Sequence, residues 1–304
     1  MRLKYVVDVN RDAASALADL HGAQVADVDG AMGDASVGTT VVCSSTDTHA
    51  DLILASAAQK KHAFCEKPVD LAIERARACA DAVQKAGVVC MIGFQRRFDP
   101  TFSALKARID AGEVGDPEML IVTSRDPGAP PVEYIRHSGG VFKDTLIHDF
   151  DIFRWILGDG RHAARDGQLP RRSGHCRSGR YRFDRGDDSH EARASLPDQH
   201  RAAYVYDQRF ELLGSLGMLQ AGNVRPTEVT SYTKSAVSSD VPEAFFLERY
   251  RAAYAAEIAH FFDAVYNGTP VRTTVAGGLK ALELAEAATL SWREKRIVKL
   301  GEDA

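Results

Sequence analysis

A histidine flanked by carboxylates is the first candidate for acid–base chemistry in this sequence. Asp144, His148 and Asp151 lie four and then three positions apart, a spacing that places side chains on one face of a helix. A carboxylate beside an imidazole raises the histidine pKa and orients the ring, as a general base requires. One histidine with two carboxylates lacks the further histidines of a typical zinc site, so we expect no metal here. A purely structural pair is the alternative.

A lysine follows the short apolar run at residues 62–65, in the sequence F-C-E-K-P. The run is typical of a buried strand, and the proline at its end blocks further pairing of the backbone. At a dry crevice, the Lys67 ammonium could donate to a substrate hydroxyl and stabilise the alkoxide charge that develops there. An exposed Glu66–Lys67 pair, which contributes little, is the alternative.

Asp8 follows the apolar run 3–7. In dinucleotide-binding folds, an acid at the end of the second strand accepts hydrogen bonds from the ribose hydroxyls of the cofactor. It would also repel a 2′-phosphate and so favour NAD over NADP, although the nearby Arg11 could pair with that phosphate. A turn or a helix cap is the alternative for an isolated aspartate.

The apolar run 39–43 leads into the small polar residues Ser44, Ser45 and Thr46. Such residues at the end of a strand suit a cofactor crevice and a helix N-cap equally well. A glycine-rich phosphate loop should lie about 20 residues before the ribose-binding acid. Only seven residues precede Asp8. Either the fold does not bind a dinucleotide, or its first strand is missing from this sequence.

Short apolar runs alternate with helix-like stretches over the first 120 residues. The apolar runs are 3–7, 39–43, 62–65, 88–92 and 119–123, and the helix-like stretches are 11–20, 48–59, 71–86 and 101–111. This order predicts βαβ crossovers and a parallel sheet. Because the runs are continuously apolar, we expect a sheet that is covered on both faces.

The pattern changes after a Pro/Gly-rich loop at residues 126–131. Beyond it we expect helices and strands in mixed order at 144–157, 203–213, 229–232, 243–266 and 278–294. We therefore predict two domains, a doubly wound α/β domain over 1–120 and an α+β domain over 121–304.

Residues 160–201 differ from the rest of the chain. They hold ten arginines and four histidines but no valine, isoleucine, methionine or tryptophan. A nucleic-acid patch would be basic in this way, but glycines, prolines and six acids interrupt every helical or strand period. We therefore expect 160–202 to be irregular.

Overall composition limits the class of protein. The 304 residues are 45% hydrophobic, with a net charge of −4 and five cysteines without a C-x-x-C pair. No apolar run approaches the roughly 20 residues of a membrane span, and the start has no signal-peptide core. We expect a cytoplasmic protein without membrane or nucleic-acid partners.

Five motifs in order resemble the glucose–fructose oxidoreductase/inositol dehydrogenase family, often written Gfo/Idh/MocA. They are VVDVN, CSSTDTH, FCEKP, GFQRRFD and GGVFKDTLIHDFDIFRW. The resemblance covers about 3–159 and 203–300. It implies a Rossmann-like parallel-sheet domain, here without its first strand and G-x-G-x-x-G loop, and then an α+β domain with a mostly antiparallel sheet. It also implies NAD as cofactor and a homo-oligomer, a tetramer formed through the second domain's sheet.

The resemblance assigns roles residue by residue. Catalytic roles fall on Lys67, Asp144 and His148. Cofactor-binding roles fall on Asp8, Ser44, Ser45, Thr46, His49, Glu66 and Lys67, and substrate-binding roles on Arg96, Asp126 and Tyr206. The implied reaction is NAD-dependent oxidation of a cyclic polyol, with myo-inositol giving its 2-keto product as the first candidate. Another polyol or sugar substrate, or a non-catalytic remnant without the phosphate loop, is the alternative.

Overall fold

The computed structural model describes residues 2–128, 130–158, 162–166, 180–184, 193–195 and 205–300. The chain forms two compact units, each assembled from two stretches of sequence. Unit 1 contains the residues up to Gly93 together with His260–Leu279, and unit 2 contains Phe94–Ala259 together with the residues from Lys280 onward.

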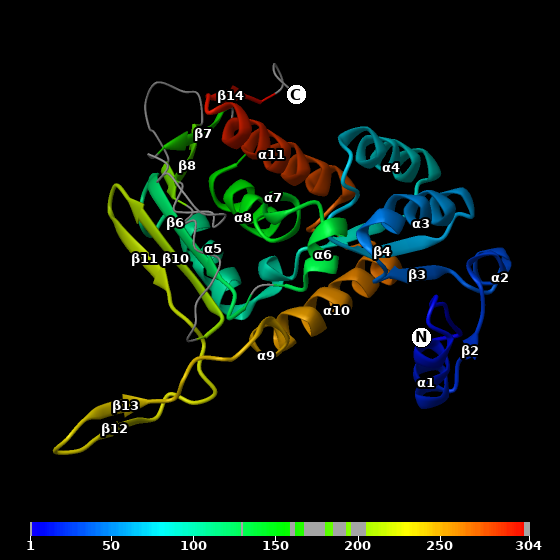
Figure 1. Cartoon of the computed structure of the whole chain (residues 1–304), viewed down its shortest axis with the longest axis horizontal. Coiled ribbons are helices and arrows are strands. Elements are labelled where there is room, and N and C mark those ends of the chain that lie inside the picture. Colours follow the sequence, from blue (N-terminus) through cyan, green and yellow to red (C-terminus); the bar gives the residue numbers. More distant parts are fainter. Residues whose placement is uncertain are drawn as a thin grey trace. The chain divides into compact units, whose positions relative to one another are not determined.

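Two parallel sheets form the centre of unit 1. One sheet pairs, in order, β3 (Thr39–Val42), β4 (His62–Glu66) and β5 (Cys90–Gly93). The other pairs β1 (Tyr5–Val6) with β2 (Gln24–Val25). The connecting helices are α1 (Arg11–His21), α2 (Val28–Gly33), α3 (Thr46–Ala58) and α4 (Ile73–Ala86). Helices α3 and α4 lie side by side (Figure 1). The predicted parallel α/β fold is confirmed.

The order of these strands agrees with a Rossmann sheet that lacks its first strand. In that fold the first strand lies between the second and the fourth. When β1 is taken as the second strand and β3 as the fourth, the two sheets form the two sides of this order. No described strand bridges β1 and β3. Val41 in β3 is accordingly 53% exposed, although strands inside such a sheet are normally buried.

Local sequence signals set the helix ends in both units. The Asn10 side chain accepts hydrogen bonds from the first turn of α1, and Gly22 ends that helix with φ 62°. In unit 2, the Asp99 side chain caps α5 (Pro100–Asp110), and Pro100 occupies its first position, where no backbone N–H is needed.

The sheet of unit 2 is mostly antiparallel, as expected. It contains, in order, β11 (Gly217–Ala221), β10 (Asp207–Gly214), β6 (Pro117–Arg125) and β9 (Arg193–Ser195). Only the β6–β9 pair is parallel. The prediction that 119–123 continues the parallel sheet of the first domain is wrong. A continuous apolar run does not specify its partner, and here β10, about 90 residues away in sequence, pairs with it.

The helices of unit 2 differ from the prediction at one important place. Besides α5, they are η1 (Gln95–Phe98), α6 (Val132–His137), α7 (Val141–Asp144), α8 (Ile147–Leu157) and α9 (Phe246–Arg249). Two longer helices, α10 (Arg251–Asn267) and α11 (Val275–Glu294), contribute to both units. The helix predicted at about 144–157 is confirmed as α8, but it begins at Ile147, and Asp144 instead ends the separate helix α7.

Part of the unusual arginine-rich stretch forms strands. β7 (His162–Asp166) pairs with β8 (Arg180–Asp184) and with β14 (Val298–Lys299). The expectation of an irregular segment is wrong for β7, β8 and β9, because pairing uses backbone groups that every residue except proline supplies. The other residues of 160–202 lie outside the described part of the chain.

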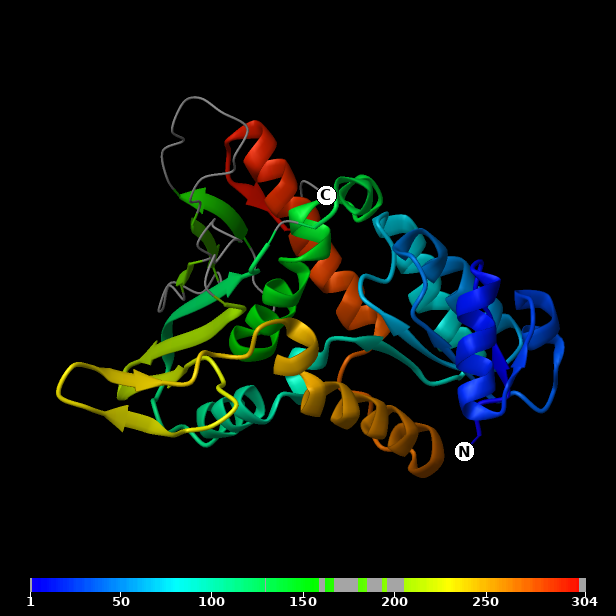
Figure 2. The same ribbon diagram turned by 60° about the horizontal axis from the view of Figure 1, so that its bottom comes forward.

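A two-stranded hairpin, β12 (Thr230–Tyr232) and β13 (Val237–Ser239), extends beyond the main sheet of unit 2 (Figure 2). In the described ranges, no helix is long and apolar enough to cross a membrane.

Candidate functional site

The predicted cofactor residues of unit 1 lie at the carboxyl ends of its strands. Asp8 follows β1 and accepts a hydrogen bond from the Asn10 backbone N–H at 2.7 Å. After β3, the Ser44 hydroxyl lies 2.6 Å from the Thr48 hydroxyl, and Ser45 occupies the N-cap position of α3. Within the described chain, the Ser45 side chain makes no capping hydrogen bond. The first turn of α3 therefore keeps N–H groups that could bind an anionic group.

Glu66 ends β4 and Lys67 follows it, as the sequence predicts, and both are half-buried. Burial raises the pKa of the Glu66 carboxyl, while Lys67 acts in the opposite direction. The carboxylate lies close to Gly93 on β5, where a Cβ atom would come within 2.8 Å of Glu66 Oε2. Gly93 thus leaves the space that this carboxylate occupies.

His49 is buried more completely than a residue that contacts the cofactor should be. Its side chain is 1% exposed, and both ring nitrogens contact backbone carbonyl oxygens. The prediction that His49 binds the cofactor directly therefore has no support from its contacts.

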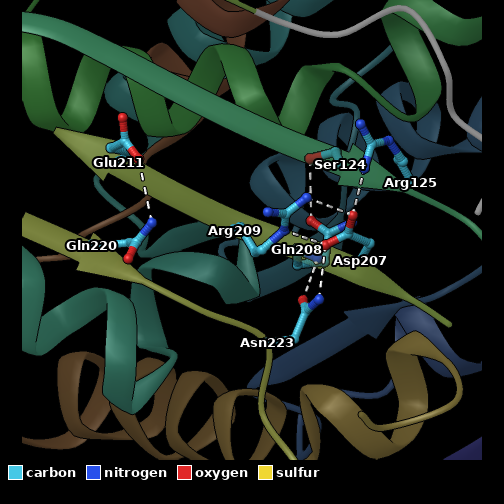
Figure 3. Close-up of polar contacts among 8 residues, drawn as sticks. All are labelled: Ser124, Arg125, Asp207, Gln208, Arg209, Glu211, Gln220 and Asn223. Atoms are coloured by element: carbon cyan, nitrogen blue, oxygen red, sulfur yellow. Dashed lines mark hydrogen bonds and ion pairs between the residues drawn. The ribbon is translucent and has the colours of Figure 1, made fainter. Parts of the chain in front are cut away.

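In unit 2, Asp207 is the centre of a polar network at the junction of β6 and β10 (Figure 3). The carboxylate is fully buried and accepts a hydrogen bond from Arg125 at 2.7 Å. Arg209 donates to it at 2.6 and 3.0 Å, and the Asn223 amide donates at 2.8 Å. The Asn223 carbonyl oxygen accepts from the Gln208 backbone N–H at 2.7 Å. These bonds hold the two strands in register.

The register places two predicted substrate residues opposite each other. Asp207 pairs with Arg125, so the next residues outward on the two strands are Tyr206 and Asp126. Tyr206 is 6% exposed, and its ring centroid lies 6.0 Å from that of Tyr250. Burial raises the pKa of Tyr206 well above its usual range, with Tyr250 and Asp126 adding to the rise and Arg96 opposing it. Tyr206 is therefore a neutral hydroxyl donor near neutral pH.

Arg96, the third predicted substrate residue, is 2% exposed and forms a buried ion pair with Asp149. The same Nη1 donates to the Ser124 hydroxyl at 3.2 Å, and Ser124 donates to Asp149 at 2.7 Å. Burial alone would lower the pKa of Arg96, but Asp149 outweighs that effect and raises it. Its position suits support of the neighbouring Tyr206 better than direct contact with a ligand.

The predicted catalytic pair of unit 2 occupies two separate helices. Asp144 ends α7 and accepts a hydrogen bond from the Tyr134 hydroxyl at 2.9 Å. His148 lies in the first turn of α8, with its ring edge-on to Phe94 at 6.0 Å. Asp151 does not join them, because its carboxylate is buried and paired with Arg97 at 2.6 Å. The predicted single face for Asp144, His148 and Asp151 is wrong.

Tyr134 is the residue that sequence reasoning missed most clearly. Burial raises its pKa, and the carboxylates of Asp144 and Asp126 add to that rise. Tyr134 therefore lies close to both acids, and it donates its one O–H proton to Asp144. It follows a proline-rich loop with no periodic pattern, so nothing in the sequence pointed to it.

Both parts of the chain match models of one known protein family. Residues 1–94 match the NAD-binding Rossmann fold of the Gfo/Idh/MocA oxidoreductases, and residues 106–300 match the C-terminal alpha/beta domain of the same family. The chain belongs to the Gfo/Idh/MocA oxidoreductase family. Like the family's Rossmann domain, it uses NAD, and the recognition made from its motifs is confirmed.

Relatives of this Gfo/Idh/MocA oxidoreductase are similar over nearly the whole chain. The inositol 2-dehydrogenase of Rhizobium meliloti strain 1021 is 40% identical over 311 residues, 98% of this chain and 92% of that protein. The crystal structure of a myo-inositol dehydrogenase from Corynebacterium glutamicum has a TM-score of 0.89 at 34% identity, covering 99% of this chain and 91% of that one. The scyllo-inositol dehydrogenase of Lactobacillus casei, solved with NAD(H) and scyllo-inositol, has a TM-score of 0.88 at 25% identity, covering 99% and 92%.

The residues after the strands of unit 1 offer hydrogen-bond partners for only part of a dinucleotide. Asp8 offers a carboxylate for ribose hydroxyls, and the start of α3 offers hydroxyls and backbone N–H groups. The sequence contains no G-x-G-x-x-G turn to cradle the pyrophosphate.

The buried tyrosines of unit 2 predict a specific alkaline response. Burial raises the pKa of Tyr250 to about 12, and within the described residues its hydroxyl has no hydrogen-bond partner. Because the unfolded chain releases this proton near pH 10, the free energy of unfolding should fall between pH 10 and 12, by about 2–3 kcal/mol from Tyr250. Tyr250→Phe should flatten that fall in urea denaturation. Tyr232→Phe, in the exposed hairpin, is the control, and equal slopes for both variants would contradict the assignment.

Proposed function

We propose that this oxidoreductase oxidises a cyclic polyol with NAD, taking myo-inositol to its 2-keto product. The observation that carries the proposal is the gathering of neutral donors and carboxylate acceptors in unit 2. Tyr134 contacts Asp144, and both tyrosines, Tyr134 and Tyr206, have pKa values raised in part by Asp126. A ring with a hydroxyl on every carbon is recognised through such hydrogen bonds. The inositol dehydrogenases among the relatives support the same substrate class.

Each catalytic role follows from side-chain chemistry. His148 takes the proton of the reacting hydroxyl as general base. Lys67 donates a hydrogen bond to a substrate hydroxyl oxygen and stabilises the negative charge that develops there. Asp144, fixed by Tyr134, orients the imidazole and accepts from a neighbouring substrate hydroxyl. Bound NAD would supply the hydride acceptor of the reaction, its nicotinamide ring.

Cofactor and ring contacts complete the proposal. Asp8, Ser44, Ser45 and Thr46 would hold NAD, with Glu66 beside them. Asp126 and Tyr206 would bind ring hydroxyls. Arg96, whose charge acts on the Tyr206 hydroxyl, would help to position that side chain.

Removal of the base or of the lysine should abolish catalysis. We expect His148→Ala and Lys67→Met each to lower kcat for NADH formation from myo-inositol by about 100-fold or more. NADH absorbance measures the rate, and a panel with scyllo-inositol and aldoses, each with NAD and NADP, identifies the preferred substrate. His21→Ala and Lys85→Met, exposed on α1 and α4, are matched controls. Wild-type activity that survives either catalytic replacement would exclude this mechanism.

Tyr134 should matter more for turnover than for binding. Because its hydroxyl holds Asp144 at 2.9 Å, Tyr134→Phe should lower kcat about threefold to tenfold while the KM for NAD stays unchanged. Steady-state kinetics with the polyol as varied substrate measures the effect. An unaltered kcat would show that Asp144 is held without Tyr134.

We also propose that the outer face of the unit 2 sheet joins copies of this chain into a homo-oligomer, with four subunits as the first candidate. Leu213 pairs in register with Met119 on one side and Met218 on the other. Leu213 is 37% and Met218 53% exposed, which leaves an apolar patch over β10 and the edge strand β11. A cytoplasmic location stays a prediction.

A charge on this patch should separate the subunits. We expect Met218→Lys to shift the mass measured by light scattering after gel filtration from oligomer towards monomer. Leu20→Lys, an exposed apolar residue on α1, is the control and should leave the mass unchanged. A monomeric wild-type protein would refute the proposal.

A further inference from the structure

His49 makes a pair of contacts that a neutral histidine cannot satisfy. Its Nδ1 lies 2.7 Å from the Pro68 carbonyl oxygen, and its Nε2 lies 3.0 Å from the Ser44 carbonyl oxygen. Both partners are backbone carbonyls, which accept hydrogen bonds and never donate them. A neutral imidazole has one N–H donor and one bare nitrogen, whereas the protonated ring has two donors.

A bare nitrogen would therefore face the lone pairs of a carbonyl oxygen. The side chain is 1% exposed, so water cannot replace a missing contact cheaply. We propose that His49 is held as an imidazolium in the folded protein and that this buried cation ties together the two loops of the cofactor edge.

The two acceptors belong to the loops after neighbouring strands. Ser44 follows β3, and Pro68 follows β4 by two residues. His49 itself lies in the first turns of α3, which packs against β4 and α4. One side chain thus fixes the separation of two loops that no strand pairing connects beyond Val42 and Cys65.

The ionisable groups on these packed elements are predominantly acidic. Beside His49 on its own helix are Asp47 and Asp51, and Glu66, Lys67 and Asp70 lie around the end of β4. The Asp70 carboxylate is 5% exposed and is already paired with Arg75 of α4 at 2.9 Å. The thiols Cys43, Cys65 and Cys79 come from β3, β4 and α4; burial raises the pKa of Cys79 to about 11, so it adds no charge. Arg75 also pairs with Asp51 at 2.8 Å, so Asp51 and Asp70 share one arginine, and the remaining negative charge favours a cation at this position.

The consequence for function rests on the proposed cofactor edge. Ser44 immediately precedes Ser45 and Thr46, and Pro68 immediately follows Lys67. His49 is therefore a positioning residue: it touches neither cofactor nor substrate, but it sets the backbone on which the cofactor hydroxyls and the lysine lie. Loss of either hydrogen bond should loosen that backbone and weaken cofactor binding.

The charge state can be read directly by NMR of the full-length protein labelled with nitrogen-15 on histidine. His62 is an internal reference, because its Nδ1 accepts a hydrogen bond from the Val89 backbone N–H at 3.0 Å and must be bare. We expect two protonated nitrogens for His49 and one for His62 at pH 7.5, with His49→Asn and His62→Asn used to assign the signals. A bare nitrogen on His49 would overturn the proposal.

The positioning role is tested by NADH binding, followed by its fluorescence without any polyol. His49→Leu keeps the bulk but removes both donors and should weaken NADH binding about tenfold. His49→Asn should give an intermediate loss, and His21→Asn, on the surface of α1, should give none. If folded His49→Leu, checked by circular dichroism, binds NADH as tightly as the wild type, His49 does not position the cofactor edge. Because no polyol is present, this result is independent of the proposed substrate.

Discussion

The buried carboxylate of Asp207 is the constraint on which the polar side of unit 2 depends. A carboxylate without solvent costs several kcal/mol unless charged and hydrogen-bonding partners surround it, and here the charged Arg125 and Arg209 and the neutral amide of Asn223 do so (Figure 3). The arginines keep 24% and 46% of their side chains exposed, which reduces their own desolvation cost. The result is a fixed register of β10 on β6. That register, rather than any loop, determines where Asp126 and Tyr206 lie.

Unit 1 positions its residues by a different means. Parallel strands end at one edge of their sheet, so successive carboxyl ends bring residues together without side-chain locks. The loops beyond those ends lack ladder hydrogen bonds, and in the described chain His49 connects two of them through backbone carbonyls. A backbone acceptor does not depend on the identity of the residue that supplies it. These two contacts therefore do not depend on the side chains of Ser44 and Pro68, whereas the ion pair of Arg125 with Asp207 depends on both of its side chains.

Sequence reasoning succeeded where one short element determines a residue's position. β4 delivers Glu66 and Lys67 to the sheet edge because an apolar run followed by proline allows few alternatives. It failed where position depends on distant partners. Asp151 shares a helical period with His148, yet Arg97, 54 residues earlier in the chain, pairs with its carboxylate and buries it. Tyr134 was missed because no periodic pattern surrounds it and its hydrogen bond to Asp144 forms only in the folded chain. β6 was assigned to the wrong sheet because its partner, β10, is distant in sequence.

The charged groups of unit 2 favour a neutral ligand over an anionic one, independently of the family resemblance. Among the arginines of this region, Arg96 is paired with Asp149, and Arg125 and Arg209 share the single carboxylate of Asp207. Asp126 and Asp144 lie near Tyr134, and Asp126 and Arg96 lie near Tyr206; both tyrosines are neutral, and the Tyr134 hydroxyl donates to Asp144. Carboxylates accept hydrogen bonds from hydroxyls and repel anions, while neutral tyrosines donate to hydroxyl oxygens. A neutral, polyhydroxylated ring satisfies both kinds of group at once, and an anionic substrate would leave the two acids facing its charge.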